Sequence, residues 1–322
     1  KALGLTPVVA TELEFYIIDD LGPDLRVPPS PRSGKRRNQA EILALRQLDA
    51  FDQFFTEIYD ACEAMDIPAD TLISEAGPGQ FEINMMHQSD ALKAADDAWL
   101  FKLLVKGVAR KYGFAASFMA KPYEDYAGNG MHMHFSVLDQ QGRNIFDNGS
   151  TEGSEALHHA IAGCLAGMAG SMLIFAPHAS SYDRFVPGAH APTALAWGYE
   201  NRTTALRVPS GAPAARRIEH RVAGGDVNPY LLVASILGAA LSGIEGKLTP
   251  RAPTHGNAYD AASPHLPTTW GEAIAAFEDC QMTAQIFPRE LVANYLATKR
   301  QEMHYMAELS PEEQMQLYLD TV

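Results

Sequence analysis

Ionisable residues alternate with apolar residues in four separate stretches of this 322-residue chain. Because successive side chains of a strand point to opposite faces, this alternation places the ionisable side chains on one face. The residues on these faces are Glu12, Glu14, Glu82, His132, His134, Arg217, Glu219 and Arg221. An unpaired buried ion costs several kcal/mol. Each such face therefore either belongs to a solvent-exposed edge strand, whose charged side chains pair with one another, or contacts ions of opposite sign.

A Gly-Pro-Gly turn separates Glu75 from Glu82 and could bring the two carboxylates side by side. Converging carboxylates repel one another and stay ionised when divalent cations neutralise them. Carboxylate oxygens select Mg²⁺ or Mn²⁺ over zinc, and one histidine is compatible with Mn²⁺. The candidate ligands are Glu12, Glu14, Glu75, Glu82, His132 and Glu219. Scattered surface acids are the alternative interpretation.

Arginines gather in the part of the chain that is otherwise apolar or rich in Gly and Pro. They are Arg184, Arg202, Arg207, Arg217 and Arg221. Planar guanidinium groups near cations commonly bind phosphoryl and carboxylate groups. Together with the carboxylates, they indicate phosphoryl transfer as the type of reaction.

The elements that must position these groups follow from local patterns. We expect strands at 6–18, at 74–85 around the turn, and at 131–137 after the Gly128-Asn-Gly entry. Apolar residues recur at helical spacing over 39–65 and 91–112. Prolines and the basic run 35–37 predict an exposed loop over 21–38, and a long irregular connection is expected over 249–267.

The composition predicts a globular protein, because 47% hydrophobic residues suffice for a large core. The net charge of −14 argues against nucleic-acid and anionic-membrane partners. The apolar runs 164–177 and 231–244 are too short to span a bilayer. Three cysteines far apart predict neither a disulfide framework nor a zinc site, so we expect a reducing, cytoplasmic compartment. No signal peptide is apparent, and a first strand so close to residue 1 suggests a chain cut from a longer protein.

Six motifs resemble the catalytic domain of bacterial-type glutamine synthetases over nearly the whole chain. They are Glu12-Leu-Glu14-Phe, Glu75-Ala-Gly-Pro-Gly-Gln-Phe-Glu82, Gly130-Met-His132-Met-His134, Arg184-Phe-Val-Pro-Gly, Asn201-Arg202-Thr-Thr-Ala-Leu-Arg207 and Arg217-Ile-Glu219-His-Arg221. The resemblance implies an α+β fold over 1–322, with a curved, mainly antiparallel sheet lined by metal-binding carboxylates and packed with helices, as in guanido kinases. It also implies stacked homo-oligomeric rings. The family's small N-terminal β-grasp domain has no counterpart in this chain.

The same resemblance implies roles for single residues. Glu14, Glu75 and Glu82 would hold one cation and Glu12, His132 and Glu219 a second, with two to three ions per site. His134, Ser136, Arg207 and Arg217 match ATP-binding positions, and Arg202 matches the arginine on the transferred phosphoryl group. Gly128, Arg184 and Arg221, together with Glu75, would bind glutamate. The implied activity is ATP-dependent formation of γ-glutamyl phosphate and its transfer to ammonium or an amine.

The sequence departs from the ammonium-using enzymes at three positions. Ala189 and His190 stand where those enzymes have an aromatic residue and a glutamate, and Ala127 replaces an asparagine. The run Trp197-Gly-Tyr-Glu-Asn-Arg resembles the γ-glutamylpolyamine synthetase branch. We therefore expect a γ-glutamyl-amine ligase in which His190 is the candidate base.

Three alternatives stay open: a true glutamine synthetase, a non-catalytic assembly protein with the same fold, and a phosphagen-type kinase. Tyr259 resembles a tyrosine that is adenylylated in some relatives, and we interpret it as an ordinary loop residue.

Overall fold

One open sheet of eight strands carries the predicted faces, and the computed structural model describes residues 3–19, 26–37, 39, 41–260 and 263–322. The strands lie in the order β2-β3-β1-β5-β8-β7-β6, and β4 also pairs with β1. Every pair is antiparallel except β6 with β7. The strands are β1 Thr6–Asp19, β2 Ala69–Ser74, β3 Gln80–Met85, β4 Phe114–Ser117, β5 Met131–Leu138, β6 Trp197–Tyr199, β7 Leu206–Val208 and β8 Ile218–His220.

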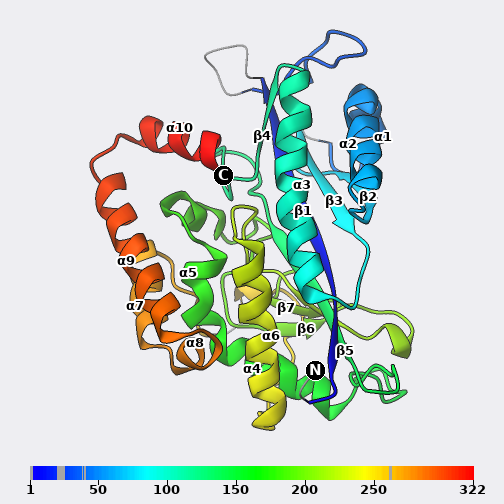
Figure 1. Ribbon diagram of the computed structural model, residues 1–322, viewed down its shortest axis with the longest axis vertical. Coiled ribbons are helices and arrows are strands. Elements are labelled where there is room, and N and C mark those ends of the chain that lie inside the picture. The colour runs from blue at the N-terminus through cyan, green and yellow to red at the C-terminus, as the bar shows by residue number, and fades with distance from the viewer. Residues whose placement is uncertain (1–2, 20–25, 38, 40, 261–262) are drawn as a thin grey trace.

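Helices pack against this sheet, so the expected α+β class is confirmed. In Figure 1, α3 runs along β1 with α1 and α2 beside it, whereas α7, α8 and α9 form the opposite flank. The α-helices are α1 Leu45–Ala50, α2 Asp52–Ala64, α3 Ala91–Lys111, α4 Glu155–Met168, α5 Met172–Phe175, α6 Pro229–Glu245, α7 Trp270–Asp279, α8 Gln281–Ile286, α9 Arg289–Met306 and α10 Pro311–Thr321. Short 3₁₀ turns are η1 Ala169–Ser171, η2 Ala179–Arg184, η3 Pro213–Ala215 and η4 Ala258–Asp260.

The alternation along β1 separates the core from the cavity side of the sheet. Leu13 and Phe15 are fully buried, whereas Glu12 and Glu14 on the other face are partly exposed. The Phe15 ring lies 6.3 Å from the Phe101 ring of α3 and 5.4 Å from that of Phe118. These aromatic contacts bury the apolar face under α3. The glutamates are thereby held on the side of the sheet that helix α3 does not cover.

The helix predicted over 39–65 is wrong at its start and is broken in the middle. Helix α1 begins only at Leu45, because Leu43 has a left-handed backbone with a φ of 57°. At Phe51 the φ of −126° separates α1 from α2. Residues 38 and 40 lie outside the described part of the chain. The apolar spacing was therefore correct for two short helices and not for one long helix.

The other predicted elements agree with the structure. Helix α3 begins after Asp90, whose Oδ1 accepts hydrogen bonds from the backbone N–H groups of Leu92 and Lys93, as an N-cap does. The loop expected over 21–38 is confirmed for residues 26–37 and lies outside the described residues elsewhere. Within the described part of 249–267, η4 is the one helical turn, and His265 forms a single bridge.

One continuous helical stretch is longer than the sequence indicated. Residues Glu155–Phe175 are long and apolar enough to cross a membrane, with a mean hydropathy of 1.4. However, 72% of that stretch is buried inside the protein. It therefore has the burial of a core helix.

Helices α4 and α6 approach each other closely at Gly163 of α4 and Gly243 of α6. This close approach leads to a prediction about stability. A Cβ on Gly163 would lie 2.1 Å from the Ala239 carbonyl oxygen. We expect Gly163→Ala to lower the free energy of unfolding by about 1–3 kcal/mol, the usual cost of overpacking.

The matched control is Gly107→Ala in α3, where an added Cβ meets no atom within 4 Å. Because alanine favours a helix over glycine, this control should raise the free energy of unfolding by up to about 1 kcal/mol. Urea unfolding of both variants gives the comparison. Equal effects would contradict the close approach of the two helices.

Candidate active site

Strand register places the ionisable residues in adjacent rows on one face of the sheet. Glu14 lies opposite Glu82, and Glu12 lies opposite His132 on its other side. A further row joins His134 to Glu219 and Glu219 to Arg207. Cross-strand neighbours on one face have Cβ atoms about 4.5–5.5 Å apart. Residues 120 positions apart in sequence, such as Glu12 and His132, therefore become direct neighbours.

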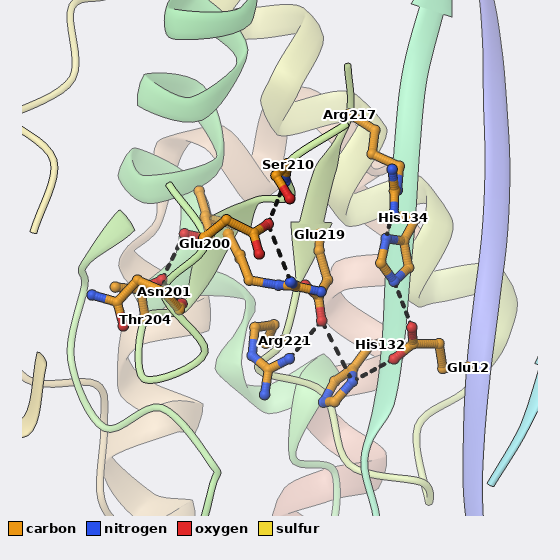
Figure 2. Close-up of polar contacts among 12 residues, drawn as sticks. Glu12, His132, His134, Glu200, Asn201, Thr204, Ser210, Arg217, Glu219 and Arg221 are labelled. Atoms are coloured by element: carbon orange, nitrogen blue, oxygen red, sulfur yellow. Dashed lines mark hydrogen bonds and ion pairs between the residues drawn. The ribbon is translucent and has the colours of Figure 1, made fainter. Parts of the chain in front are cut away.

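Glu12 lies between two histidines, as Figure 2 shows. Its Oε2 is 2.9 Å from Nδ1 of His132, and its Oε1 is 2.7 Å from Nε2 of His134. Nε of Arg217 donates to Nδ1 of His134 at 3.2 Å. Because Nδ1 accepts this bond, the proton on Nε2 of His134 is the one donated to Glu12. The contact with Arg217 thus sets the tautomer and orientation of His134.

Glu219 is buried beneath two arginines. Nη1 of Arg221 donates to its Oε1 at 2.5 Å, and Nε of Arg207 donates to its Oε2. Burial alone would raise the pKa of Glu219, but Arg221 and the nearby histidines lower it to about 2. Nδ1 of His132 lies 3.8 Å from Oε1 of Glu219. The charge of Glu219 is therefore compensated within the protein.

Glu14 and Glu82 are compensated less fully, because burial and neighbouring carboxylates prevail at both groups. Burial, with the neighbouring carboxylates of Glu12 and Glu14, raises the pKa of Glu82 to about 10. Burial and the Glu75 carboxylate raise the pKa of Glu14 to about 7, although the N–H of Gly130 donates to Glu14 at 2.6 Å. A divalent cation between these groups would favour their charged forms.

Two groups of side chains could hold such cations. One comprises Glu12, His132 and Glu219, and the other comprises Glu14, Glu82 and His132. Within each group the ligand atoms lie within 4.8 Å of one another. Carboxylate oxygens with one imidazole nitrogen fit Mg²⁺ or Mn²⁺. Glu75, the remaining predicted ligand, lies beside these groups but belongs to neither.

Two cavities lie end to end along this face. The first has a volume of about 510 Å³ and the second about 960 Å³. Glu12 and Asn84 line both cavities. The shared lining places Glu12 and Asn84 at the junction between them.

The first cavity contains most of the predicted site residues. Besides Glu12 these are Glu14, Glu75, Glu82, Gly128, His132, Arg184, His190, Arg202, Arg207 and Arg221. Of the four residues predicted to bind ATP, His134, Ser136 and Arg217 line the second cavity. Arg207 instead lines the first cavity, because its bond to Glu219 turns it toward that side. Glu219 itself lies beneath the arginines and lines neither cavity.

Arg184 and Gly128 form one edge of the first cavity. Arg184 is 4% exposed, and its Nη1 donates to the Val222 carbonyl at 2.7 Å. A Cβ on Gly128 would lie 2.4 Å from the Ala120 carbonyl oxygen and 2.8 Å from Cγ of Arg184. Glycine is therefore required at this position for the backbone and the aliphatic part of the Arg184 side chain to approach each other.

Sequence reasoning missed two residues of β3, Gln80 and Asn84. Nε2 of Gln80 donates to the Gly128 carbonyl and to Oδ1 of Asn129, at 3.0 Å each. Oδ1 of Asn84 is buried and has no hydrogen-bond partner among the described residues. The signal was present, because both residues alternate in phase with Glu82.

The residues that depart from the ammonium-using enzymes also lie at the first cavity. Ala127, Ala189 and His190 line it, and His190 is exposed with a left-handed φ of 61°. Oη of Tyr259 donates to the Ala191 carbonyl at 2.9 Å. Tyr259 therefore has a structural contact to the loop that carries His190.

The fold and the site define an α+β protein with an acidic, histidine-containing sheet face bordered by buried arginines. The protein-family model of the glutamine synthetase catalytic domain matches residues 1–318 of this chain. The chain belongs to this family.

Individual relatives agree with this assignment. The chain is 37% identical over 319 residues to the gamma-glutamylputrescine synthetase PuuA of Escherichia coli K12, covering 98% of this chain and 68% of that protein. It is 36% identical over 301 residues to the gamma-glutamylethanolamide synthetase GlnA4 of Streptomyces coelicolor, covering 93% of this chain and 64% of that protein. The chain thus spans about two thirds of the length of these relatives.

A solved GmaS/ADP complex has a similar fold, with a TM-score of 0.85 and 28% identity. The similarity covers 98% of this chain and 74% of the chain in that complex.

Proposed function

We propose that the protein is an ATP-dependent ligase that forms γ-glutamyl phosphate from glutamate and transfers the γ-glutamyl group to an amine. The observation that carries this proposal is the junction at Glu12, where a cavity lined by arginines and carboxylates meets one lined by His134, Ser136 and Arg217. A nucleotide in the second cavity would direct its terminal phosphate toward the junction. Glutamate in the first cavity would meet it there.

The residues of the first cavity suit both steps. In the first step a γ-carboxylate oxygen of glutamate bonds to the γ-phosphorus of ATP, and ADP leaves. Arg202 and Arg207 would stabilise the charge on the phosphoryl oxygens, while Arg184, Arg221 and Gly128 would hold glutamate. In the second step the amine nitrogen bonds to the acyl carbon, and phosphate leaves. His190 would accept the proton that the amine loses.

The donor sets described above would hold Mg²⁺ or Mn²⁺ through Glu12, Glu14, Glu82, His132 and Glu219, with Glu75 beside them. Such ions neutralise phosphate charge and polarise phosphoryl oxygens when bound. The protein's part is to hold the carboxylates in register on one rigid sheet face, a geometry set by strand pairing.

An amine larger than ammonium is favoured by the small side chains at the acceptor end. Ala127 and Ala189 leave space, and an exposed histidine replaces an anionic group. The relatives from Escherichia coli and Streptomyces coelicolor are named as synthetases of γ-glutamylputrescine and γ-glutamylethanolamide. The alternative for this chain is a true glutamine synthetase that uses ammonium.

ADP release with ATP, Mg²⁺ and glutamate should be measured with ammonium, ethylamine, ethanolamine, putrescine and spermine. We expect turnover with at least one organic amine to exceed turnover with ammonium. Turnover with ammonium alone would support the alternative. Absence of turnover with every acceptor would favour a non-catalytic homologue, whereas a stable phosphorylated product would favour a kinase.

His190→Glu separates the two ligase hypotheses. If His190 is the base for organic amines, we expect this variant to lose preference for them relative to ammonium. An unchanged acceptor profile would contradict a role for His190.

We further propose a cytoplasmic homo-oligomer. The three cysteines, Cys62, Cys164 and Cys280, are free, as is usual in a reducing compartment. The ring arrangement of the family supports the oligomeric part of the proposal, which light scattering of the purified protein would test.

A further inference from the structure

The first cavity has an aliphatic wall that the ligase chemistry does not use. Its members are Ile42, Leu43 and Ile73, with Ala76 beside them. Ile42 is 57% exposed and Leu43 is 71% exposed. Large apolar side chains exposed at a cavity are typical of a site that binds an apolar ligand group.

This wall adjoins the carboxylates of the sheet. Ile73 lies opposite Glu82 in the pairing of β2 with β3, on the face that carries the carboxylates. Ser74 and Glu75 follow directly in the sequence. The row that runs through Glu14 and Glu82 thus ends in an aliphatic side chain. A ligand that spans this boundary needs a cationic end and an apolar end.

The segment that carries Ile42 and Leu43 is fixed to the end of β2. The N–H of Leu43 donates to the Ser74 carbonyl at 2.8 Å, and the N–H of Ala44 donates to Oγ of Ser74 at 2.8 Å. Oγ of Ser74 in turn donates to the Glu41 carbonyl at 3.1 Å. These bonds hold Leu43 at a φ of 57°, which is unfavourable for leucine. The side chain is therefore presented at the cavity at a conformational cost.

Among the described residues that line the first cavity, every carboxylate belongs to the cluster Glu12, Glu14, Glu75 and Glu82. The aliphatic wall offers no counter-ion. An ammonium group placed against it would lose hydration without a partner, which is costly. A methyl group at the same place would gain apolar contact.

We propose that Ile42, Leu43 and Ile73 bind the alkyl chain of the acceptor, so that the substrate class is primary alkyl monoamines in preference to diamines and ammonium. This inference rests on the proposed ligase function and specifies its acceptor. The nitrogen lies toward the carboxylates, and the chain extends along the wall.

The test compares n-pentylamine with putrescine, since the two differ by a methyl group in place of the distal ammonium. We expect kcat/KM of the full-length protein to be at least about tenfold higher for n-pentylamine, as for other discriminations between a polar and an apolar group. Leu43→Asp places a carboxylate on the wall, and we expect it to move the ratio at least about tenfold toward putrescine.

Two controls isolate the charge. Leu43→Asn has nearly the same shape as Leu43→Asp without the charge, and both residues tolerate a left-handed backbone. Leu45→Asp adds the same charge at a 75% exposed position outside the cavity lining. Ile42→Asp is a second variant on the wall, in case Leu43→Asp does not fold.

The outcomes separate the two hypotheses. A wild-type preference for putrescine, or equal ratios in Leu43→Asp and Leu45→Asp, overturns the alkyl-chain site and leaves the ligase function standing. ADP release that no amine stimulates overturns both.

Discussion

Glu12→Gln is expected to lower kcat by about 10³-fold, the largest effect of any single conservative change at this site. The Glu12 carboxylate is hydrogen-bonded to both His132 and His134, and it lies at the junction of the two cavities. The amide keeps the shape but loses the charge that would bind a cation. Charge stabilisation by a bound ion is worth several kcal/mol, and about 4 kcal/mol corresponds to 10³-fold. Steady-state ADP release measures the effect.

A second measurement separates cation binding from catalysis. Ligands that bind the folded state raise Tm by mass action. We expect Mn²⁺ to raise the Tm of the wild type and to raise that of Glu12→Gln much less. Glu41→Gln is the control, because Glu41 pairs with Arg46 at the surface. A kcat within tenfold of the wild type, with an unchanged Mn²⁺ response, would remove Glu12 from the site.

Glu219→Gln is expected to destabilise the protein by about 3–5 kcal/mol, the usual cost of removing one partner of a buried ion pair. The side chain of Glu219 is 1% exposed and compensates both Arg207 and Arg221. Without its charge two buried guanidinium groups lose their counter-ion. Urea unfolding gives the free energy, and ADP release should fall as well because Arg207 and Arg221 line the first cavity.

Glu200→Gln is the matched control. Glu200 lies 3.5 Å from Nη1 of the same Arg207, but its side chain is 50% exposed. Exposed pairs contribute up to about 1 kcal/mol, so the loss should be within that range. Equal losses in the two variants would show that burial of Glu219 does not matter for stability.

The sheet face could be predicted from the sequence because a strand has a strict period of two. The period of two put Glu12 and Glu14 on one face of their strand and Glu219 with its flanking arginines on one face of another. The motif resemblance then implied that Glu12, His132 and Glu219 meet at one cation. Gln80 and Asn84 follow the same period and were overlooked because amides do not stand out as ionisable groups. The sequence therefore identified the charged residues of this face, and it did not identify the neutral amides Gln80 and Asn84.

Other features depend on contacts that sequence spacing does not contain. The left-handed Leu43 arises where the segment is tied to Ser74 in β2. Arg207 turns toward the first cavity because Glu219 on the next strand holds it. Some of these contacts join residues that are distant in the chain. Others join adjacent strands, and local sequence patterns do not determine the register of such strands.

The meeting of the two cavities at Glu12 has a consequence for the order of kinetic events. If glutamate and the acceptor bind in the 510 Å³ cavity, as proposed, a compound that fills this cavity should block both and leave the 960 Å³ cavity accessible. Its inhibition should be competitive with glutamate and non-competitive with nucleotide. Spent nucleotide can also depart through its own cavity while the activated acyl group stays in the other. Release of ADP would then not require exposure of the proposed γ-glutamyl phosphate to solvent.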